Sequence, residues 1–265
     1  MPSTETAIAL SGFEPSAIDS IEEIKHGLTN ESWLVSARGE RRVVRLSTTQ
    51  EEALQIDRAS EANILQIVSG ERIGPDVIVC DPSRRLLVTR YMGATWTNED
   101  TQEPANIGRI GELLQKLHAL DAPWEVRRVD LLAVVEGYLR TLDEQGVLCE
   151  LNTPQLRARA CGVAITLHRS AADRLCHNDV HALNVVEGDD GLRLLDWEYA
   201  GVGQPMFDLA SICVYHQYDG AQRERLLTAY AHDRAPSAPH QLELACWLFE
   251  YVRDLWMAVR AEKRG

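Results

Sequence analysis

The amino-acid sequence predicts an α+β fold, with a small lobe of antiparallel strands followed by a larger helical lobe. Three observations point to this fold. Short apolar runs broken by turn residues fill much of the first ninety residues, and apolar residues at helical spacing fill most of the remainder. One short strand pair near residue 190 interrupts the helical part. We therefore expect two lobes, formed by residues 1–91 and 92–265.

Four strands and one helix are expected in the first lobe. The turn residues Arg38-Gly39-Glu40 and Asp81-Pro82-Ser83 each separate two apolar runs, so the runs are expected to pair as hairpins. Helical spacing of apolar residues that ends near Gly70 predicts a helix between the two hairpins. The expected elements are strands over residues 33–35, 43–46, 77–80 and 86–89, and a helix over residues 51–68.

The second lobe is expected to be mostly helical. Gly188-Asp189-Asp190-Gly191 is a strong hairpin turn, so the apolar runs on either side of it, at 185–186 and 192–195, are expected to pair. Residues 90–93 lie where the two patterns meet and are expected to form a hinge. Helices are expected over residues 107–120, 129–142, 156–167 and 221–231, and from residue 239 onwards.

Composition argues against several classes of function. The net charge of −13 is unfavourable for an extended nucleic-acid interface, which needs a basic face. The six cysteines contain no C-x-x-C pair, so neither a disulfide scaffold nor a thiolate zinc site is expected. The first residues lack the basic segment of an export signal, and no apolar run approaches the ~20 residues that span a bilayer. We expect a cytoplasmic protein without nucleic-acid or membrane partners, and its oligomeric state stays open.

The most informative segment is His177-Asn178-Asp179-Val180-His181-Ala182-Leu183-Asn184. It places an aspartate two residues after a histidine and an asparagine five residues further on. Phosphoryl transfer from ATP needs a carboxylate that orients the attacking hydroxyl and oxygen ligands that hold magnesium. Asp179 suits the first role and Asn184 the second. Asp196, across the expected hairpin, can supply a metal carboxylate beside Asn184.

Simpler interpretations of these residues also exist. His177, Asp179 and His181 alternate, so on a strand they would share one face and could bind zinc. That interpretation leaves Asn184 and the D-W-E-Y run after it unexplained. His177 is expected to be structural. Glu198 is expected to be either a second metal ligand or a solvated charge of the hairpin, and the sequence does not decide between the two.

Two ordered motifs carry a resemblance to a known family. His177 to Asn184, followed by Asp196-Trp197-Glu198-Tyr199-Ala200-Gly201 and Phe207-Asp208-Leu209-Ala210, resembles the aminoglycoside phosphotransferase and choline kinase superfamily, and within it bacterial choline and thiamine kinases. The resemblance implies a two-lobed protein-kinase-like fold. It also implies Asp179 as the catalytic base, Asn184 and Asp196 as magnesium ligands, and Asp208 as a structural residue beside His177.

The same resemblance extends to the first lobe. Residues 27–32 look like the phosphate-covering loop of choline-kinase-like proteins, and Arg45 on the next strand looks like their phosphate-pairing cation. Glu61 on the following helix would be the partner of Arg45, although an ordinary surface ion pair is the alternative. Residues 90–93 would contact adenine. The implied nucleotide-binding residues are Thr29, Asn30, Ser32, Arg45, Glu61, Arg90, Tyr91 and Met92.

The acceptor is expected at the last helix. Trp247, Tyr251 and Asp254 share one helical face, and aromatic rings with a carboxylate suit an organic cation. Trp256 and Tyr199 resemble aromatic residues that surround choline in choline kinases, although packing in the core would also explain these aromatics. Choline kinases usually carry a second tryptophan, and a glutamate where this chain reads Val214-Tyr215-His216.

The sequence therefore predicts a kinase that uses ATP and Mg²⁺ to phosphorylate the hydroxyl of a small molecule. A cationic acceptor of the choline, thiamine or ethanolamine type is expected from the resemblance. A kinase for an amino sugar or an aminoglycoside is an alternative with the same catalytic residues. A catalytically silent ATP-binding regulator is the alternative from another class, and the presence of every catalytic residue type argues against it.

Overall fold

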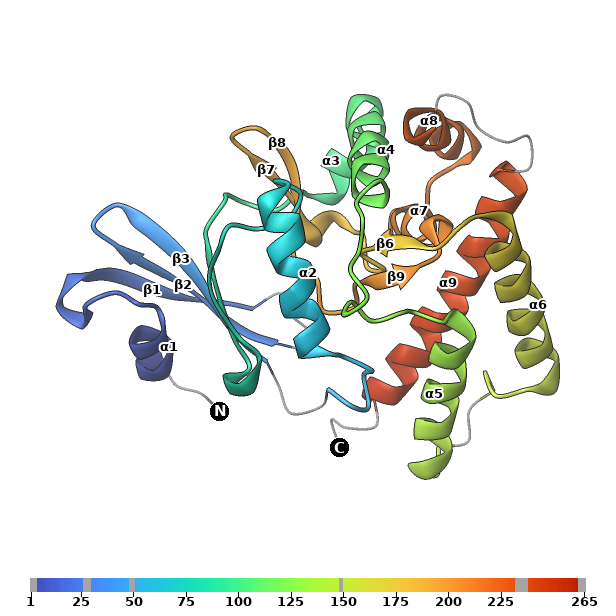
Figure 1. Cartoon of the computed structure of the whole chain (residues 1–265), viewed down its shortest axis with the longest axis horizontal. Helices are drawn as coiled ribbons and strands as arrows, with labels where there is room; N and C mark the ends of the chain where they lie inside the picture. The colour runs from blue at the N-terminus through green and yellow to red at the C-terminus, as the bar shows by residue number, and fades with distance from the viewer. Residues whose placement is uncertain (1–3, 26–29, 48–50, 148–149, 232–237, 262–265) are drawn as a thin grey trace.

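A five-stranded antiparallel sheet forms most of the N-terminal lobe (Figure 1). The computed structural model describes residues 4–25, 30–47, 51–147, 150–231 and 238–261. The sheet has the strand order β1-β2-β3-β5-β4, and every neighbouring pair is antiparallel. Its strands are β1 (Ile18–Ile24), β2 (Asn30–Ala37), β3 (Glu40–Ser47), β4 (Val77–Asp81) and β5 (Leu86–Arg90).

Both predicted hairpins of this lobe are present. Gly39 has a φ of 81° in the turn between β2 and β3, a conformation that glycine adopts without strain. A 3₁₀ turn over Pro82–Arg84 joins β4 to β5, and the Asp81 side chain accepts hydrogen bonds from the backbone of this turn. The predicted strand pairs therefore follow from local turn chemistry.

Two N-terminal elements were not predicted. Helix α1 (Thr4–Leu10) and strand β1 precede the first predicted strand. The isoleucines of β1 recur every third residue, which does not match the two-residue period of a strand. The register of β1 against β2 shifts between Ile18 and Ser20, whereas Ile21 and Ile24, three residues apart in the regular stretch that follows, lie on opposite faces of the sheet.

Helix α2 (Arg58–Gly70) begins seven residues later than predicted. The side chain of Asp57 accepts a hydrogen bond from Ser60 N at 3.0 Å and caps the helix. Residues 51–55 form turns instead. The start at Arg58 matters for the site, because it directs this side chain and that of Glu61 to the same buried region.

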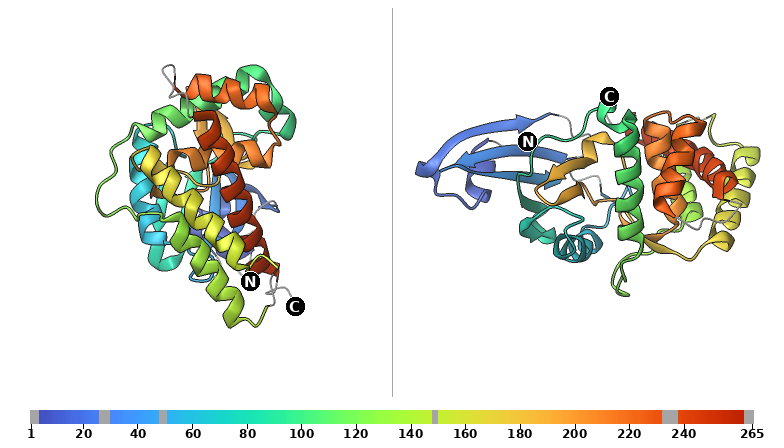
Figure 2. Two further views of the ribbon diagram at one scale, coloured as in Figure 1. Left: turned by 90° about the vertical axis from the view of Figure 1, so that its right-hand side faces the viewer. Right: turned by 90° about the horizontal axis from the view of Figure 1, so that it is seen from above.

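The C-terminal lobe is helical, apart from two short strand pairs (Figure 2). The predicted hairpin consists of β7 (Val185–Gly188) and β8 (Gly191–Leu194), and a second pair joins β6 (Arg174–Cys176) to β9 (Gly201–Gly203). The helices are α3 (Asn98–Gln102), α4 (Pro104–His118), α5 (Leu131–Glu144), α6 (Pro154–Ser170), α7 (Pro205–Tyr215), α8 (Gly220–Tyr230) and α9 (Ala238–Ala261).

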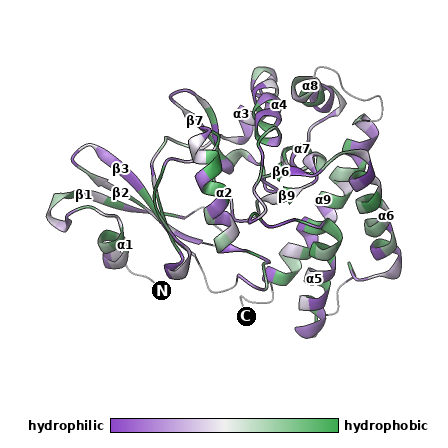
Figure 3. Ribbon diagram, in the orientation of Figure 1, coloured by the Kyte–Doolittle hydropathy of each residue, from purple (hydrophilic) through white to green (hydrophobic). Residues whose placement is uncertain are grey.

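The core spans both lobes. Ile64, Leu65 and Val68 of α2 belong to the same buried cluster as the apolar residues of α4, α7 and α9. A second, smaller cluster lies between α1 and the sheet. Figure 3 shows that α2, α5, α6 and α9 each carry both hydrophobic and hydrophilic positions, as partly buried helices do. In the described ranges, no helix is long and apolar enough to cross a bilayer.

Candidate active site

A cavity of about 800 Å³ contains most of the predicted site residues. The sheet, the segment after β5, the loop before β7 and the helices α7 and α9 all contribute to its walls. The predicted residues that line it are Ser32, Arg45, Arg90, Tyr91, Met92, Asp179, Asn184, Asp196, Tyr199 and Trp256. Residues that are far apart in the sequence therefore meet at one place.

Asp208, on α7, holds the loop that carries Asp179. Its Oδ2 accepts a hydrogen bond from His177 N at 2.8 Å, and its Oδ1 accepts one from Asn178 N at 2.6 Å. His118 Nε2 lies 3.0 Å from Oδ2. Asp208 is completely buried, so these donors supply the interactions that water would otherwise provide. Asn178 has a φ of 66°, and the bond to Asp208 helps to keep this uncommon conformation.

Further contacts fix the same loop. His177 Nε2 lies 2.9 Å from Leu195 O, and His177 Nδ1 accepts a hydrogen bond from Asp179 N at 3.3 Å. Burial lowers the pKa of His177, which favours the neutral ring that this pairing needs. Both ring nitrogens are engaged, so the zinc alternative with His177, Asp179 and His181 is not supported.

Asp179 is positioned by three side chains. Tyr215 donates its hydroxyl hydrogen bond to Asp179 Oδ1 at 3.0 Å. Asp179 Oδ2 lies 3.5 Å from His181 Nε2 and 3.4 Å from Asn184 Nδ2. Burial raises the pKa of Asp179, but the contacts with His181, His177 and Tyr215 outweigh this effect and hold it below its ordinary value. The group is therefore an ionised hydrogen-bond acceptor that faces the cavity.

Asn184 and Asp196 lie at adjacent ends of the predicted hairpin. Leu195 N donates a hydrogen bond to Asn184 O at 2.8 Å, which joins the two segments directly. Asp196 has a φ of 61°, and its side chain is 36% exposed. Although the side chain is partly exposed, the surrounding protein desolvates its carboxyl group, and this desolvation together with the nearby Glu198 carboxylate raises the pKa of Asp196 to about 7.

This arrangement fits a divalent cation. Carboxylate and amide oxygens are the ligands that Mg²⁺ prefers, and both kinds line the cavity at Asn184 and Asp196. Burial raises the pKa of Asp196 most, and the nearby carboxylate of Glu198 raises it further; a bound cation would offset the negative charge of these carboxylates. Another cluster, of His118, Cys176 and Asp208, also brings metal-ligand atoms close together in the described part of the chain. That cluster is fully buried, and Asp208 already binds two backbone donors there.

A buried ionic network links the two lobes beside this site. Arg45 Nη2 donates to Glu61 Oε1 at 2.6 Å, and Arg45 Nη1 donates to Asp196 Oδ1 at 2.8 Å. Arg45 and Glu61 are 8% and 3% exposed, so the surface-pair alternative for them is wrong. Burial raises the pKa of Glu61, but Arg45 and Arg58 lower it more strongly, so Glu61 stays ionised.

Arg45 also has an orphaned donor. Its Nε is buried and has no hydrogen-bond partner among the described residues. The Arg45 side chain lines the cavity, and its pKa stays raised because Glu61, Asp196 and Glu198 outweigh the effect of burial. A permanently charged guanidinium with spare donor capacity fits a phosphate group.

Glu198 is neither solvated nor freely available. It is 2% exposed, and its Oε2 accepts hydrogen bonds from Asn30 Nδ2 at 2.8 Å and from Arg58 Nη2 at 3.0 Å. The interpretation of Glu198 as a solvated hairpin charge is therefore wrong. Asn30, expected in the phosphate-covering loop, contacts Glu198 and Arg58 instead of projecting into open space. Ser32 lines the cavity, and Thr29 lies outside the described residues.

The segment after β5 forms the other end of the cavity. Arg90, Tyr91 and Met92 line it, and Gly93 has a φ of 114°. Tyr91 N donates to Arg41 O at 3.0 Å, and the Arg41 guanidinium lies 4.2 Å from the centre of the Tyr91 ring. This segment then enters the second lobe, where Trp96 N donates to Val185 O at 2.9 Å.

The last helix carries only part of the predicted acceptor site. Tyr199 and Trp256 line the cavity, and Trp256 Nε1 donates to the Tyr199 hydroxyl at 2.9 Å. Trp247, Tyr251 and Asp254 do not line it. Trp247 stacks on Tyr251 with ring centres 5.6 Å apart, and Arg159 of α6 lies over the Trp247 ring. Asp254 pairs with the neighbouring Arg253.

The packing of α9 explains why these three residues lie away from the cavity. Trp247, Tyr251 and Asp254 do share a helical face, but α9 packs against α5 and α6 as well as α7. The Tyr251 hydroxyl, for example, donates to Leu151 O at 2.8 Å. The residues of α9 that reach the cavity are Phe249, Val252, Arg253, Trp256 and Met257. Helical spacing identifies a face, but it does not identify the partner of that face.

Several residues that line the cavity, and Arg58 of the ionic network beside it, were not predicted. Tyr215 lies seven residues after Asp208, two turns along α7, and this spacing could have placed it near the same loop. Arg58 lies three residues before Glu61 and could have been recognised as its helical neighbour. Tyr138, Phe207 and Phe249 add aromatic wall to the cavity; of these only Phe207 lies in a motif noted above, where Asp208 alone was given a role.

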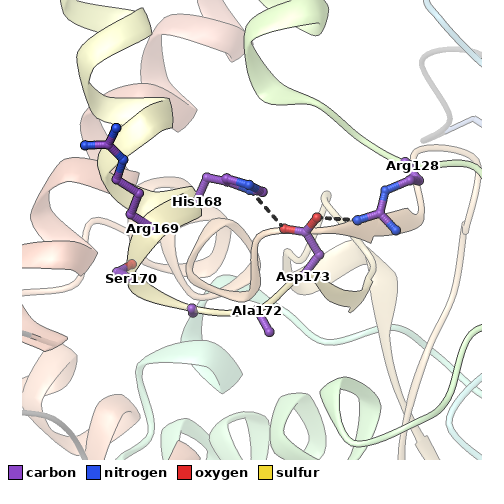
Figure 4. A pocket seen from close by; sticks show the side chains of 7 residues that line it. Arg128, His168, Arg169, Ser170, Ala172 and Asp173 are labelled. Atoms are coloured by element: carbon purple, nitrogen blue, oxygen red, sulfur yellow. Dashed lines mark hydrogen bonds and ion pairs between the residues drawn. The ribbon is translucent and has the colours of Figure 1, made fainter.

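A separate open hollow lies where α6 ends. Asp173 Oδ2 pairs with Arg128 across it, and Asp173 Oδ1 lies 3.5 Å from His168 Nδ1 (Figure 4). It shares no residue with the large cavity. Arg128 and His168 are mostly exposed, so these pairs are surface contacts of small energetic value.

Curated relatives resemble parts of this chain. Protein LicA of Haemophilus influenzae is 24% identical over 210 residues, which cover 78% of this chain and 61% of that protein. The chain thus matches less than two thirds of that relative's length. Thiamine kinase of Salmonella newport is 47% identical over 84 residues, which cover 32% of this chain and 24% of that protein.

Solved structures resemble the whole fold. Choline kinase LicA from Streptococcus pneumoniae has a TM-score of 0.80 and 22% identity, over 94% of this chain and 87% of that one. A choline/ethanolamine kinase family protein from Mesorhizobium loti has a TM-score of 0.81 and 25% identity, over 99% of this chain and 87% of that one. These likenesses confirm the predicted two-lobed kinase-like fold.

The family follows from the match to a family model. The model of the phosphotransferase enzyme family matches residues 20–243, which is most of the chain. The two motifs that carry the sequence resemblance, His177 to Asn184 and Asp196 to Gly201, lie inside this range and at the cavity. This chain belongs to the phosphotransferase enzyme family.

Proposed function

We propose that this protein transfers the γ-phosphoryl group of ATP to the hydroxyl of a small cationic molecule of the choline, ethanolamine or thiamine type. One observation carries the proposal: Asp179, Asn184, Asp196 and Arg45 line the same cavity between the two lobes. A structure of LicA in complex with AMP, with a TM-score of 0.78 to this chain, supports the use of an adenine nucleotide.

The proposed division of the chain follows the cavity. Residues 1–91 would form the nucleotide-binding lobe, with Ser32, Arg45 and the segment 90–92 against ATP. Residues 92–265 would form the catalytic and acceptor-binding lobe. Asn184 and Asp196 would hold Mg²⁺, which when bound offsets the negative charge of the phosphates.

The reaction would be a direct transfer. The acceptor oxygen forms a bond to the γ-phosphorus while the bond from that phosphorus to its bridging oxygen breaks, and ADP leaves. Asp179 Oδ2 orients the acceptor hydroxyl and accepts its proton. Tyr215 keeps Asp179 Oδ1 occupied, so the carboxylate presents one defined oxygen to the acceptor. Arg45 stabilises negative charge on the phosphates.

The aromatic wall supports the proposed acceptor class. Six aromatic residues line the cavity near α7, α9 and the Asp196 loop, and aromatic faces bind organic cations well. They are Tyr138, Tyr199, Phe207, Tyr215, Phe249 and Trp256. Arg253 also lines the cavity, and its pairing with Asp254 at 3.0 Å offsets its charge.

The same wall argues against a large polycation. An aminoglycoside carries several ammonium groups, which need several carboxylates. Near this wall, the described carboxylates that line the cavity are Asp179, Asp196 and Glu198, and the last two already bind arginines. These carboxylates can balance the single positive charge of a small acceptor better than the several positive charges of an aminoglycoside.

The test is ADP release from ATP and Mg²⁺ across a panel of choline, ethanolamine, thiamine, amino sugars and aminoglycosides. We expect one small cation to give turnover. Asp179→Asn should lower kcat by about 10²–10⁴-fold, because the general base is lost, and ADP binding measured by calorimetry should persist. Nucleotide binding without turnover on any acceptor would instead favour a non-catalytic regulator, and turnover only with aminoglycosides would overturn the acceptor class.

A further inference from the structure

Arg58 is the most connected residue of the buried ionic network. It is the first residue of α2, and it is 9% exposed. Its guanidinium donates to Glu61 Oε2 at 2.8 Å, to Glu198 Oε2 at 3.0 Å and to Asn30 Oδ1 at 3.2 Å. A fourth contact joins its Nε to Glu51 Oε1 at 3.1 Å. Arg58 therefore touches both lobes.

We propose that Arg58 is a positioning residue for phosphoryl transfer, which acts through Glu61 on Arg45 and through Glu198 on the loop of Asp196. The inference rests on the proposed function, because the groups that it positions are those assigned to the phosphates and the metal.

The first connection runs through Glu61. Its Oε1 accepts from Arg45 and its Oε2 accepts from Arg58, so the carboxylate is fixed from both sides. Arg45 in turn reaches Asp196 with its other terminal nitrogen at 2.8 Å. Without Arg58, Glu61 would retain one guanidinium partner and could rotate toward it. Arg45 would then lose the orientation that directs it to both Glu61 and Asp196.

The second connection runs through Glu198. This carboxylate follows Asp196 by two residues and is almost completely buried. A buried carboxylate that loses the ion pair with Arg58 carries a larger desolvation cost, which favours its movement toward water. Movement of Glu198 would displace Asp196, which has a left-handed backbone at φ 61° that its surroundings must maintain.

An arginine suits this position better than a lysine. Arg58 makes contacts in three directions, to Glu51, to Glu61 and to Glu198 with Asn30. A planar guanidinium with five donors can satisfy these directions together, whereas an ammonium is a single point of charge. Arg58→Lys should therefore keep the net charge and lose most of the positioning.

The chain offers a matched control. Arg85 pairs with Glu51 at 3.3 Å, as Arg58 does, and in the described part of the chain it has no recorded ion pair with Glu61 or Glu198. Arg85→Gln removes an arginine beside the same carboxylate and leaves the proposed connections intact.

The experiment compares Arg58→Gln, Arg58→Lys and Arg85→Gln with the wild type. It measures kcat on the acceptor that gives turnover in the panel described above, ADP affinity by calorimetry with Mg²⁺, and thermal unfolding. We expect Arg58→Gln to lower kcat by about 100-fold and ADP affinity by about tenfold. Arg58→Lys should recover only part of the lost kcat and ADP affinity. Arg85→Gln should keep both quantities within about twofold of the wild type. Added guanidinium ion should restore about tenfold of the lost kcat in Arg58→Gln, which a merely structural defect would not show.

Several outcomes would overturn the proposal. Arg58→Gln within about twofold of the wild type in kcat and ADP affinity would do so, and so would an equal loss in Arg85→Gln. If added guanidinium does not restore kcat in Arg58→Gln, and if the loss of kcat is proportional to the unfolded fraction, Arg58 contributes to folding alone. If the wild type turns over no acceptor, the proposed function fails. The role of Arg58 is then tested by ADP binding alone, and equal ADP affinity of the wild type and Arg58→Gln would reject it.

Discussion

At the scale of single residues, the orientation of the Asp179 carboxylate depends on Tyr215. The Tyr215 hydroxyl donates to Asp179 Oδ1, and its ring contacts His181 and Phe249 edge-on. Burial and the Asp179 carboxylate raise the pKa of Tyr215, so the hydroxyl stays protonated and remains a donor. A phenol held in this way restricts rotation of the Asp179 carboxylate.

We expect Tyr215→Phe to lower kcat by about tenfold, since a hydrogen bond to a charged group contributes about 1.5–3 kcal/mol. The KM for ATP should change little, because Tyr215 lies on α7, at the side of the cavity where we propose that the acceptor binds. Steady-state kinetics with each substrate varied in turn measures both effects. Tyr218→Phe is the matched control, because the Tyr218 hydroxyl donates to Thr101 O and not to Asp179. Unchanged kcat in Tyr215→Phe would contradict the role of this bond.

The sequence predicted the chemical residues more completely than their partners. Asp179, Asn184, Asp196 and Asp208 belong to ordered motifs, and the structure brings the first three to one cavity while Asp208 binds the loop backbone. Tyr215 and Arg58 act through other residues. Their positions depend on which helices pack together, and local spacing alone does not specify that packing.

At the scale of elements, α9 has two aromatic faces with different partners. Trp256 lines the cavity beside Tyr199, whereas Trp247 lies under Arg159 on the side of α6. Because α7 and α9 also pack together, the aromatic wall of the cavity combines residues from both helices. Periodicity predicted the helix and its apolar face, and the remaining choice between the two aromatic faces required the tertiary structure.

This difference predicts different kinetic effects. Trp256→Ala should raise the KM for the acceptor by about tenfold, because a cation–aromatic contact contributes about 1–2 kcal/mol when desolvated, and should leave the KM for ATP unchanged. Trp247→Ala should lower thermal stability and leave the acceptor KM within about twofold. Initial-rate kinetics and thermal unfolding of both variants separate the two effects. An acceptor KM that rises only in Trp247→Ala would reverse the assignment of the faces.

Helix starts show where local signals misled the prediction. Charged and apolar residues at 51–57 continue the helical pattern of the sequence. In the structure, however, Asp57 caps α2, and residues 51–55 form turns. The cap was present in the sequence as an Asp with Glu61 four residues later. The apolar spacing favoured an earlier helix start than this cap does, and with that earlier start nothing in the sequence indicated a role for Arg58.

At the scale of the whole molecule, one core joins α2 to the helical lobe. Local changes in buried titratable groups should therefore appear in global unfolding. His216 accepts a hydrogen bond from Ala182 N at its Nε2, which requires a neutral ring. Burial, and then the nearby His181, lower the pKa of His216 to about 4. Burial also lowers the pKa of His177.

The sign of the pH dependence follows from proton uptake. Between pH 6.5 and about 4, the unfolded state binds protons at these histidines more readily than the folded state does. The free energy of unfolding should therefore fall as the pH falls from 6.5 to about 4, and should be regained as the pH rises through the same window to 6.5. His216 should contribute on the order of 1–2 kcal/mol of this change, after allowance for solvent screening.

Chemical denaturation at several pH values measures this slope. His216→Gln keeps an acceptor near Ala182 N and removes the titration, so the difference between the wild type and this variant isolates His216. We expect the variant to lose less stability between pH 6.5 and 4. Parallel curves for the two proteins would show that His216 does not titrate differently on folding.

The cations of the cavity are all arginines. Within the described residues, Arg45, Arg90 and Arg253 line it, and none of its lining residues is a lysine. The two described lysines, Lys25 and Lys116, are exposed. ATP-derived probes that acylate an amine beside bound nucleotide would find no lysine amine among the described residues that line the cavity. If nucleotide binds in this cavity as proposed, labelling by such probes should be weak, and arginine-directed dicarbonyl reagents should modify the described cavity wall instead.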